Sequence, residues 1–207
     1  MPDKPNYAGL TAEERRANQE MLSRLTADQW EAPTLCEGWT VRDLAGHLAS
    51  ADDMSLGRFL ATLLAAGFSP DKANQAFIDR WTVRSNDDIV AAVGSPALKG
   101  LFRVAPAGAL TEAFIHGQDI RRPLNISHAH SEESLRAAAL ATCTTPTGTG
   151  SKRRVKGLRL RATDIDWSHG EGPEVTGPAE ALVMAANGRA VALADLSGEG
   201  RDMLAAR

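Results

Sequence analysis

Residues 40–48 read TVRDLAGHL, and they hold both the start of a helix and the first residue of a candidate site. Thr40 with Asp43 three residues later predicts a helix N-terminus, because each side chain can accept a hydrogen bond from an unpaired backbone N–H there. Apolar residues then recur at positions 41, 44, 48, 51 and 59, which is the period of an amphipathic helix. His47 lies beside this stripe, so we expect its side chain to point toward the apolar face or its edge.

A second helix is expected to carry Glu112 and His116. Its apolar stripe runs from Leu110 to Ile120, and Pro123 ends it. A spacing of four residues places the two side chains on one helical face, about 6 Å apart. Two imidazoles and one carboxylate can hold a zinc ion and leave a position open for water or substrate. Asp119, three residues beyond His116, can accept the other imidazole N–H, as metal-bound histidines require.

Each part of this pattern also has a simpler interpretation. A Glu-x-x-x-His pair is often a solvated pair on a helix surface, and a lone histidine such as His47 is often a hydrogen-bonded core residue. The two histidines can also bond across the two helices without any ion. A carboxylate beside Phe114 and Ile120 is costly to desolvate unless a cation compensates, which favours a metal. Periodicity leaves open whether the three side chains meet.

The rest of the first 145 residues also has a helical period. Further helices are expected from a capping box at Thr11 toward Trp30, from Thr40 on to Gly67, from Pro70 through Trp81, over residues 86–93, and from a cap at Ser131.

The C-terminal part changes period. Leu158 and Leu160 alternate with arginines, which predicts a strand, and a second strand is expected around residues 174–176. Pro178 opens a helix that ends near residues 187–188, and a short helix follows it. The sequence TTPTGTGSK at 144–152 is typical of a linker. We therefore expect a helical domain over 1–145, a linker over 146–154 and a small α+β segment over 155–207.

Composition excludes several classes of protein. The chain of 207 residues is 43% hydrophobic with a net charge of -3, so no broad basic surface for nucleic acid is expected. Its longest uncharged apolar stretch, residues 59–70, is far shorter than the ~20 residues that span a bilayer, and its start lacks the apolar core of a signal peptide. Cys36 and Cys143 are too few for a disulfide framework and fit a reducing compartment. A cytoplasmic monomer or homodimer is expected.

Three segments resemble the mycothiol-dependent maleylpyruvate isomerase family. They are PTLCEGWTVRDLAGHL at 33–48, EAFIHGQDIRRPL at 112–124 and the C-terminal stretch 158–200. The resemblance implies a mainly α protein, a DinB-like four-helix bundle with a small C-terminal α+β appendage that looks like a reduced sterol-carrier segment. It also implies that His47, Glu112 and His116 are the ligands of a divalent metal, with zinc as the default and nickel, iron or manganese as alternatives.

The same resemblance implies a use for the metal. Mycothiol or a similar low-molecular-weight thiol would bind at the open position as thiolate and attack a small electrophile, in an isomerase or in a thiol transferase. In the isomerase the thiolate adds to a conjugated double bond, rotation follows, and the thiol leaves again. The sequence leaves the electrophile open, and no residue beyond 150 matches a substrate contact. The alternative is a non-catalytic metal-binding or small-ligand-binding module of the same fold.

Carboxylates of a thiol or substrate would call for arginine, whose planar fork binds them in a bidentate manner. Arg80, Arg84 and Arg121 are the candidates, although arginines at helix ends also complement the helix dipole. Cys36 precedes the His47 helix and can approach the site, but a free thiol is its simpler interpretation. His169 is interpreted as a turn residue.

Overall fold

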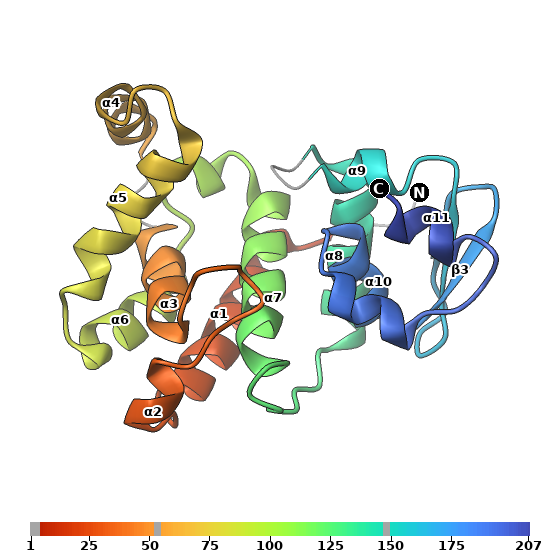
Figure 1. Ribbon diagram of the computed structural model, residues 1–207, viewed down its shortest axis with the longest axis horizontal. Helices are drawn as coiled ribbons and strands as arrows, with labels where there is room; N and C mark the ends of the chain where they lie inside the picture. Colours follow the sequence, from red (N-terminus) through yellow and green to blue (C-terminus); the bar gives the residue numbers. More distant parts are fainter. Residues whose placement is uncertain (1–4, 52–54, 147–149) are drawn as a thin grey trace. The chain divides into compact units, whose positions relative to one another are not determined.

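The computed structural model describes residues 5–51, 55–146 and 150–207. This part of the chain is mainly helical, with one small sheet (Figure 1). It forms two compact units, Asn6–His128 and Ala129–Arg207.

Among the described residues of the first unit, the named elements are all helices. They are α1 (Tyr7–Leu22), α2 (Ala27–Trp30), α3 (Val41–Ser50), α4 (Leu56–Ala65), α5 (Pro70–Thr82), α6 (Asn86–Val93), the 3-10 helix η2 (Gly100–Arg103) and α7 (Pro106–Arg121).

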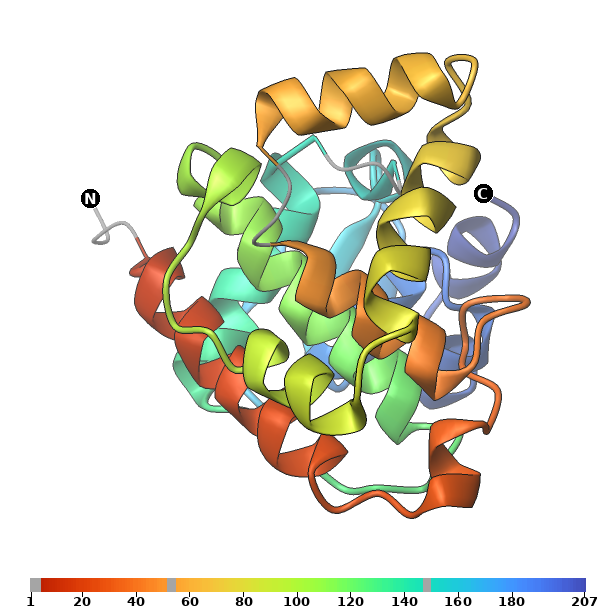
Figure 2. The same ribbon diagram turned by 90° about the vertical axis from the view of Figure 1, so that its left-hand side faces the viewer.

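Packing in this unit follows the apolar stripes. α1 runs along α7, and α3 packs on α5 while also contacting α6 and α7 (Figure 2). Leu44, Ile89 and Ile120, from three of these helices, are fully buried in one shared cluster. The result is a bundle in which α3 and α7, the two helices that carry the predicted ligands, are direct neighbours.

The helix starts show where local sequence decides structure. Thr40 and Asp43 form the predicted capping box of α3, with the Thr40 N–H donating to Asp43 Oδ2 at 2.9 Å. Ser69 caps α5, and Pro70 takes its first position, as predicted. The predicted cap at Thr11 is wrong. α1 begins at Tyr7 with Asn6 as its cap, and Thr11 is buried inside the helix, where its hydroxyl donates to the Tyr7 carbonyl.

In the structure, each of two long helices predicted from the sequence is divided into two shorter helices. The segment from Thr11 to Trp30 divides into α1 and α2, because a second capping box at Thr26 starts a new helix. The segment from Thr40 to Gly67 divides into α3 and α4, and residues 52–54 between them lie outside the described part. Gly67 ends α4 with a positive φ of 64°.

The second unit combines helices with a three-stranded sheet. Its elements are α8 (Glu132–Thr144), α9 (Ser151–Arg154), β1 (Arg159–Ala162), β2 (Ser168–His169), β3 (Glu174–Gly177), α10 (Ala179–Ala186), the 3-10 helix η3 (Ala190–Asp195) and α11 (Arg201–Ala205).

The sheet has the order β2-β1-β3, with β1 antiparallel to β2 and parallel to β3. Leu160 and Val175 are paired and fully buried, which confirms the alternation predicted for the first strand. α10 is the centre of this unit, because each of its residues except Glu180 is buried.

The division of the chain differs from the boundaries expected from sequence. α8 was expected to belong to the N-terminal domain, but it packs on α10 in the second unit. Asn187 donates to Thr142 Oγ1 at 3.2 Å, and Ser151 donates to the Thr142 carbonyl at 2.8 Å. Residues 151–154 of the expected linker form α9, while 147–149 lie outside the described residues.

Among the helices of the described residues, none has the length and apolar character needed to cross a membrane.

Candidate metal centre

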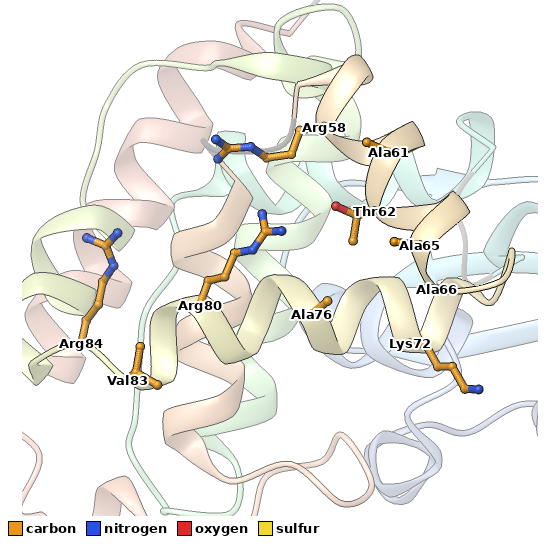
Figure 3. Close-up of a pocket in the computed structure, with 10 residues that line it drawn as sticks. All are labelled: Arg58, Ala61, Thr62, Ala65, Ala66, Lys72, Ala76, Arg80, Val83 and Arg84. Atoms are coloured by element: carbon orange, nitrogen blue, oxygen red, sulfur yellow. The ribbon is translucent and has the colours of Figure 1, made fainter.

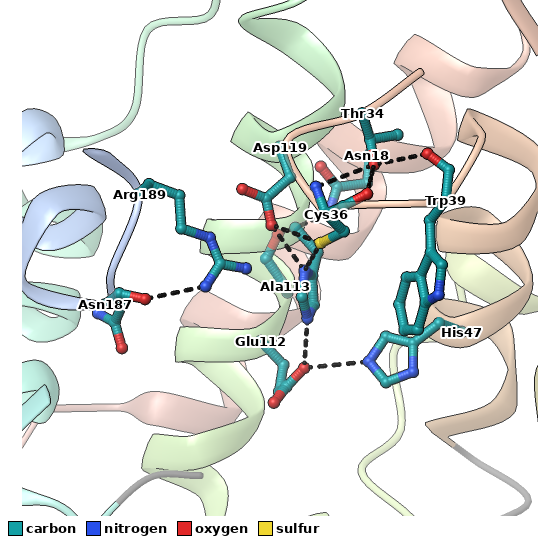
Figure 4. Close-up of polar contacts among 11 residues, drawn as sticks. Asn18, Thr34, Cys36, Trp39, His47, Glu112, Ala113, Asp119, Asn187 and Arg189 are labelled. Carbon is teal, nitrogen blue, oxygen red and sulfur yellow. Dashed lines mark hydrogen bonds and ion pairs between the residues drawn. The ribbon is translucent and has the colours of Figure 1, made fainter. Parts of the chain in front are cut away.

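The predicted ligands come from two neighbouring helices and meet. α3 presents His47 toward Glu112 of α7 (Figure 4). His116 lies one turn after Glu112 on α7. Glu112 Oε2 lies 3.0 Å from His116 Nε2 and 3.4 Å from His47 Nε2. One ligand atom from each residue lies within 4.8 Å of the others, so the three donors can share one ion.

A buried carboxylate fixes the ring of His116. Asp119 Oδ2 accepts from His116 Nδ1 at 2.9 Å, and the Asp119 side chain is fully buried. Nε2 is therefore the ring nitrogen that faces Glu112, and it can offer a lone pair to a metal once its proton is lost. This contact agrees with the orienting role predicted for Asp119.

An asparagine on a third helix fixes the ring of His47. Asn74 Oδ1, from α5, accepts from His47 Nδ1 at 3.0 Å, which again leaves Nε2 as the inward-facing atom. Asn74 is not among the residues predicted from the sequence. A signal was present, because this polar residue lies three, four and seven positions before Phe77, Ile78 and Trp81, on their apolar face.

The loop before α3 closes over Asp119. The Leu35 N–H donates to the Asp119 carbonyl at 3.1 Å, and the Cys36 thiol donates to Asp119 Oδ2 at 3.3 Å. Cys36 Sγ also lies 3.8 Å from His116 Nδ1. Cys36 therefore contacts the residue that orients a ligand, at the edge of the centre.

An aromatic wall borders the histidines. The Trp39 ring lies 5.4 Å from the His47 ring, tilted by 49°, and the two imidazoles meet edge to face at 5.0 Å. The imidazoles are largely covered, whereas the Glu112 side chain keeps 43% of its surface exposed. Access to the three donors is therefore from the side of Glu112.

The charges of Glu112 and His116 depend on each other. Burial raises the pKa of Glu112, but the charge and hydrogen bond of His116, together with those of His47, outweigh it and hold the pKa well below its usual range. Burial lowers the pKa of His116. The opposite effect is larger, because the Glu112 charge and the hydrogen bonds to Asp119, Cys36 and Glu112 hold this pKa well above its usual range. Glu112 and His116 therefore share a proton at the place where both would face a metal ion. Because a metal ion would have to replace this proton, it would bind more tightly as pH rises.

Arg80 and Arg84 lie elsewhere. They line an open groove of about 1090 Å³ between α4 and α5, together with Arg58 and Lys72. Figure 3 shows Arg80 on α5 and Arg84 just beyond the end of that helix. Within the described contacts, neither arginine reaches a predicted metal ligand. Arg80 lies over the Phe77 ring instead, and Arg84 lies over the Trp81 ring.

Arg121 is part of the packing of α1 on α7. Its side chain is 2% exposed, and it donates to Asn18 Oδ1 at 2.8 Å. Burial lowers its pKa to about 10, against the opposing effect of Glu14. A guanidinium that is already buried and bonded within the bundle is not available to a ligand of the metal centre, contrary to the role predicted for it.

Comparison with known proteins shows what part of the helical unit is similar to. Residues 11–97 match the model of the mycothiol maleylpyruvate isomerase N-terminal domain, a range that includes His47 and ends before Glu112. A search of curated proteins by sequence gave no match. Two crystal structures of the mycothiol-dependent maleylpyruvate isomerase, one of them a histidine-to-alanine mutant, share the fold at 16% and 15% identity. Each alignment covers 93% of this chain and 91% of the solved chain with a TM-score of 0.58. The expected fold class, mainly α and DinB-like, is thereby confirmed, and residues 11–97 of the helical unit are similar to the mycothiol maleylpyruvate isomerase N-terminal domain.

Proposed function

We propose that this protein is a metal-dependent enzyme that uses mycothiol or a similar low-molecular-weight thiol to isomerise a small electrophile or to transfer the thiol to it. One observation carries the proposal, namely the convergence of His47 Nε2 and His116 Nε2 on the same Glu112 oxygen, at 3.4 and 3.0 Å. The family match, and the mycothiol dependence named for the solved relatives, support the choice of thiol.

The donor set fits a divalent metal. His47, Glu112 and His116 would hold it, and zinc is the first candidate, with nickel, iron and manganese suited to the same ligands. A bound ion would act as a Lewis acid that lowers the pKa of a thiol from about 8.5, so that thiolate forms near neutral pH.

The chain's own residues prepare the site for this chemistry. Asn74 and Asp119 keep both Nδ1 atoms protonated, and the inward Nε2 lone pairs are therefore fixed in direction. The Trp39 ring packs beside His47, with the ring centroids 5.4 Å apart. The exposed side of Glu112 leaves room for a thiol and its acceptor to approach.

A non-catalytic metal-binding module is the second candidate. It is favoured by the placement of the arginines predicted to bind a substrate carboxylate, because Arg80 and Arg84 line a separate groove and Arg121 is buried. The enzyme and the module share the metal but differ in whether a thiol binds and reacts.

Metal analysis and a thiol assay on the purified full chain test both candidates. The protein should contain about one divalent ion per chain, and it should consume mycothiol or another thiol with at least one member of an electrophile panel that includes maleylpyruvate. His116→Ala should lose the metal and the activity, while His169→Ala, a change outside the centre, should keep both. Full metal retention by His116→Ala would overturn the ligand set, and metal without thiol affinity would favour the module.

A further inference from the structure

The second unit contains a pocket of its own, of about 600 Å³, which the metal centre does not use. It lies where the end of α8, the α9 turn, and strands β1 and β2 come together, and all its lining residues belong to this unit. Its volume falls within the range of about 300–1000 Å³ that is usual for small-molecule sites.

The deepest lining residues are apolar and buried. Cys143, Val155 and Leu158 are 4%, 6% and 1% exposed. Burial raises the pKa of Cys143 to about 12, so at neutral pH this residue is a neutral thiol that behaves as a small apolar group. These residues favour an apolar body in any ligand.

Backbone geometry sets the shape of the pocket wall. Gly170 has a φ of 82°, and a Cβ on it would lie 2.3 Å from the Leu158 carbonyl. Only glycine permits this approach of the β2 end to β1. The wall is therefore held by close backbone packing rather than by mobile side chains.

The exposed lining residues are basic. Lys152, Arg153 and Lys156 come from the sequence SKRRVK at 151–156, and no acidic side chain is among the residues that line the pocket. The two arginines of strand β1 do have an acidic partner: Arg159 and Arg161 lie 3.9 and 3.0 Å from Glu174. The pocket thus presents three positive charges in a protein whose net charge is -3.

We propose that this pocket binds an amphipathic organic carboxylate, with its apolar body on Cys143, Val155 and Leu158 and its carboxylate among Lys152, Arg153 and Lys156. Lysine and arginine supply charge-assisted hydrogen bonds to a carboxylate, while the apolar residues gain from covering a hydrocarbon or aryl group. A bare inorganic anion would leave the apolar residues uncovered, and a neutral lipid would leave the basic residues without a partner. The proposal concerns the second unit alone and does not depend on the metal chemistry.

Titration of the full chain with octanoate, followed by amide NMR, tests this assignment. Saturable shifts should centre on the amides of Gly157, Leu158 and Gly170. Octanol, which has the same chain without the charge, should bind at least about tenfold more weakly. Inorganic phosphate at matched concentration should not reproduce the shifts.

A charge variant gives a second measurement. Replacing Lys152, Arg153 and Lys156 together by glutamine should weaken octanoate binding about tenfold and leave octanol binding unchanged. These side chains are exposed, so a dispersed spectrum should show that the variant folds. Arg159→Gln removes an exposed charge that does not line the pocket and should bind octanoate normally. Equal binding of octanol and octanoate, equal shifts with phosphate, shifts elsewhere in the chain, or no saturable binding would each overturn the proposal.

Discussion

Replacing Asn74 tests whether the metal centre depends on residues that are not ligands. In Asn74→Leu the side chain keeps a similar size but cannot accept the hydrogen bond from His47 Nδ1, which is 3.0 Å long in the structure. The His47 ring would then be free to turn or to change tautomer, and its Nε2 lone pair would no longer be fixed toward Glu112.

The expected loss of metal affinity follows from the single hydrogen bond between His47 and Asn74. Removing a partner that orients a metal-bound histidine costs about 10- to 100-fold in metal affinity, or about 1.4 to 2.7 kcal/mol. The metal-free protein should lose only about 1 kcal/mol of folding stability, the net value of one hydrogen bond. Asn74→Asp keeps an acceptor at the same place and should retain the affinity.

The assay is competition for zinc against a chromophoric chelator, with thermal unfolding to verify the fold. Gln75→Leu is the matched control, because it removes an exposed hydrogen bond to Asp79 on the same helix and leaves His47 untouched. If folded Asn74→Leu bound zinc as tightly as the unchanged protein, the inferred role of Asn74 would be refuted.

Three further predictions follow from other contacts. Asp119→Asn should lower zinc affinity by about 10- to 100-fold in the same assay, since the histidine it orients loses a charged partner; unchanged affinity would contradict this. Gly117→Ala should cost about 1–3 kcal/mol in chemical denaturation, because its Cβ would lie 2.4 Å from the buried Arg121 guanidinium. Gly108→Ala, on the same helix with no atom within 4 Å of the added Cβ, should be neutral or stabilising by up to about 1 kcal/mol, and equal losses at both sites would argue against the packing explanation. Cys143, whose pKa is raised to about 12, should resist iodoacetamide at pH 8 in the folded protein, where roughly one thiol in ten thousand is ionised, and should react faster as pH rises; rapid labelling at pH 8, read by peptide mass spectrometry, would show that the thiol is not buried.

Local sequence predicted those parts of the fold that short-range interactions decide. Thr40 and Asp43 formed the expected capping box, and the alternation at Leu158 and Leu160 formed the expected strand. The error at Thr11 has a local cause as well. Asn6 competes for the same helix start, and a helix extends to the earlier cap when the residues between are compatible with it.

The boundary between the two units could not be predicted from local sequence. α8 has an apolar stripe and a sound N-cap, which identify it as a helix without saying what it packs on. Its partner is α10, about forty residues later, and the contact between Thr142 and Asn187 joins them. α8 and α9, the helices on either side of the predicted linker, therefore belong to the same unit.

For the predicted metal centre, the sequence by itself determined which donor atoms are on offer. Glu112 and His116 share a helical face because four residues make about one turn, and the surrounding motifs resemble a family whose pattern predicts His47 as the first ligand, with Glu112 and His116 as the second and third. Only the tertiary structure decided that the three atoms meet, that Asn74 holds one ring, and that Arg121 is buried. Each of these depends on how separate helices pack, and helix packing is set by contacts between residues far apart in the chain, which periodicity within one helix does not contain.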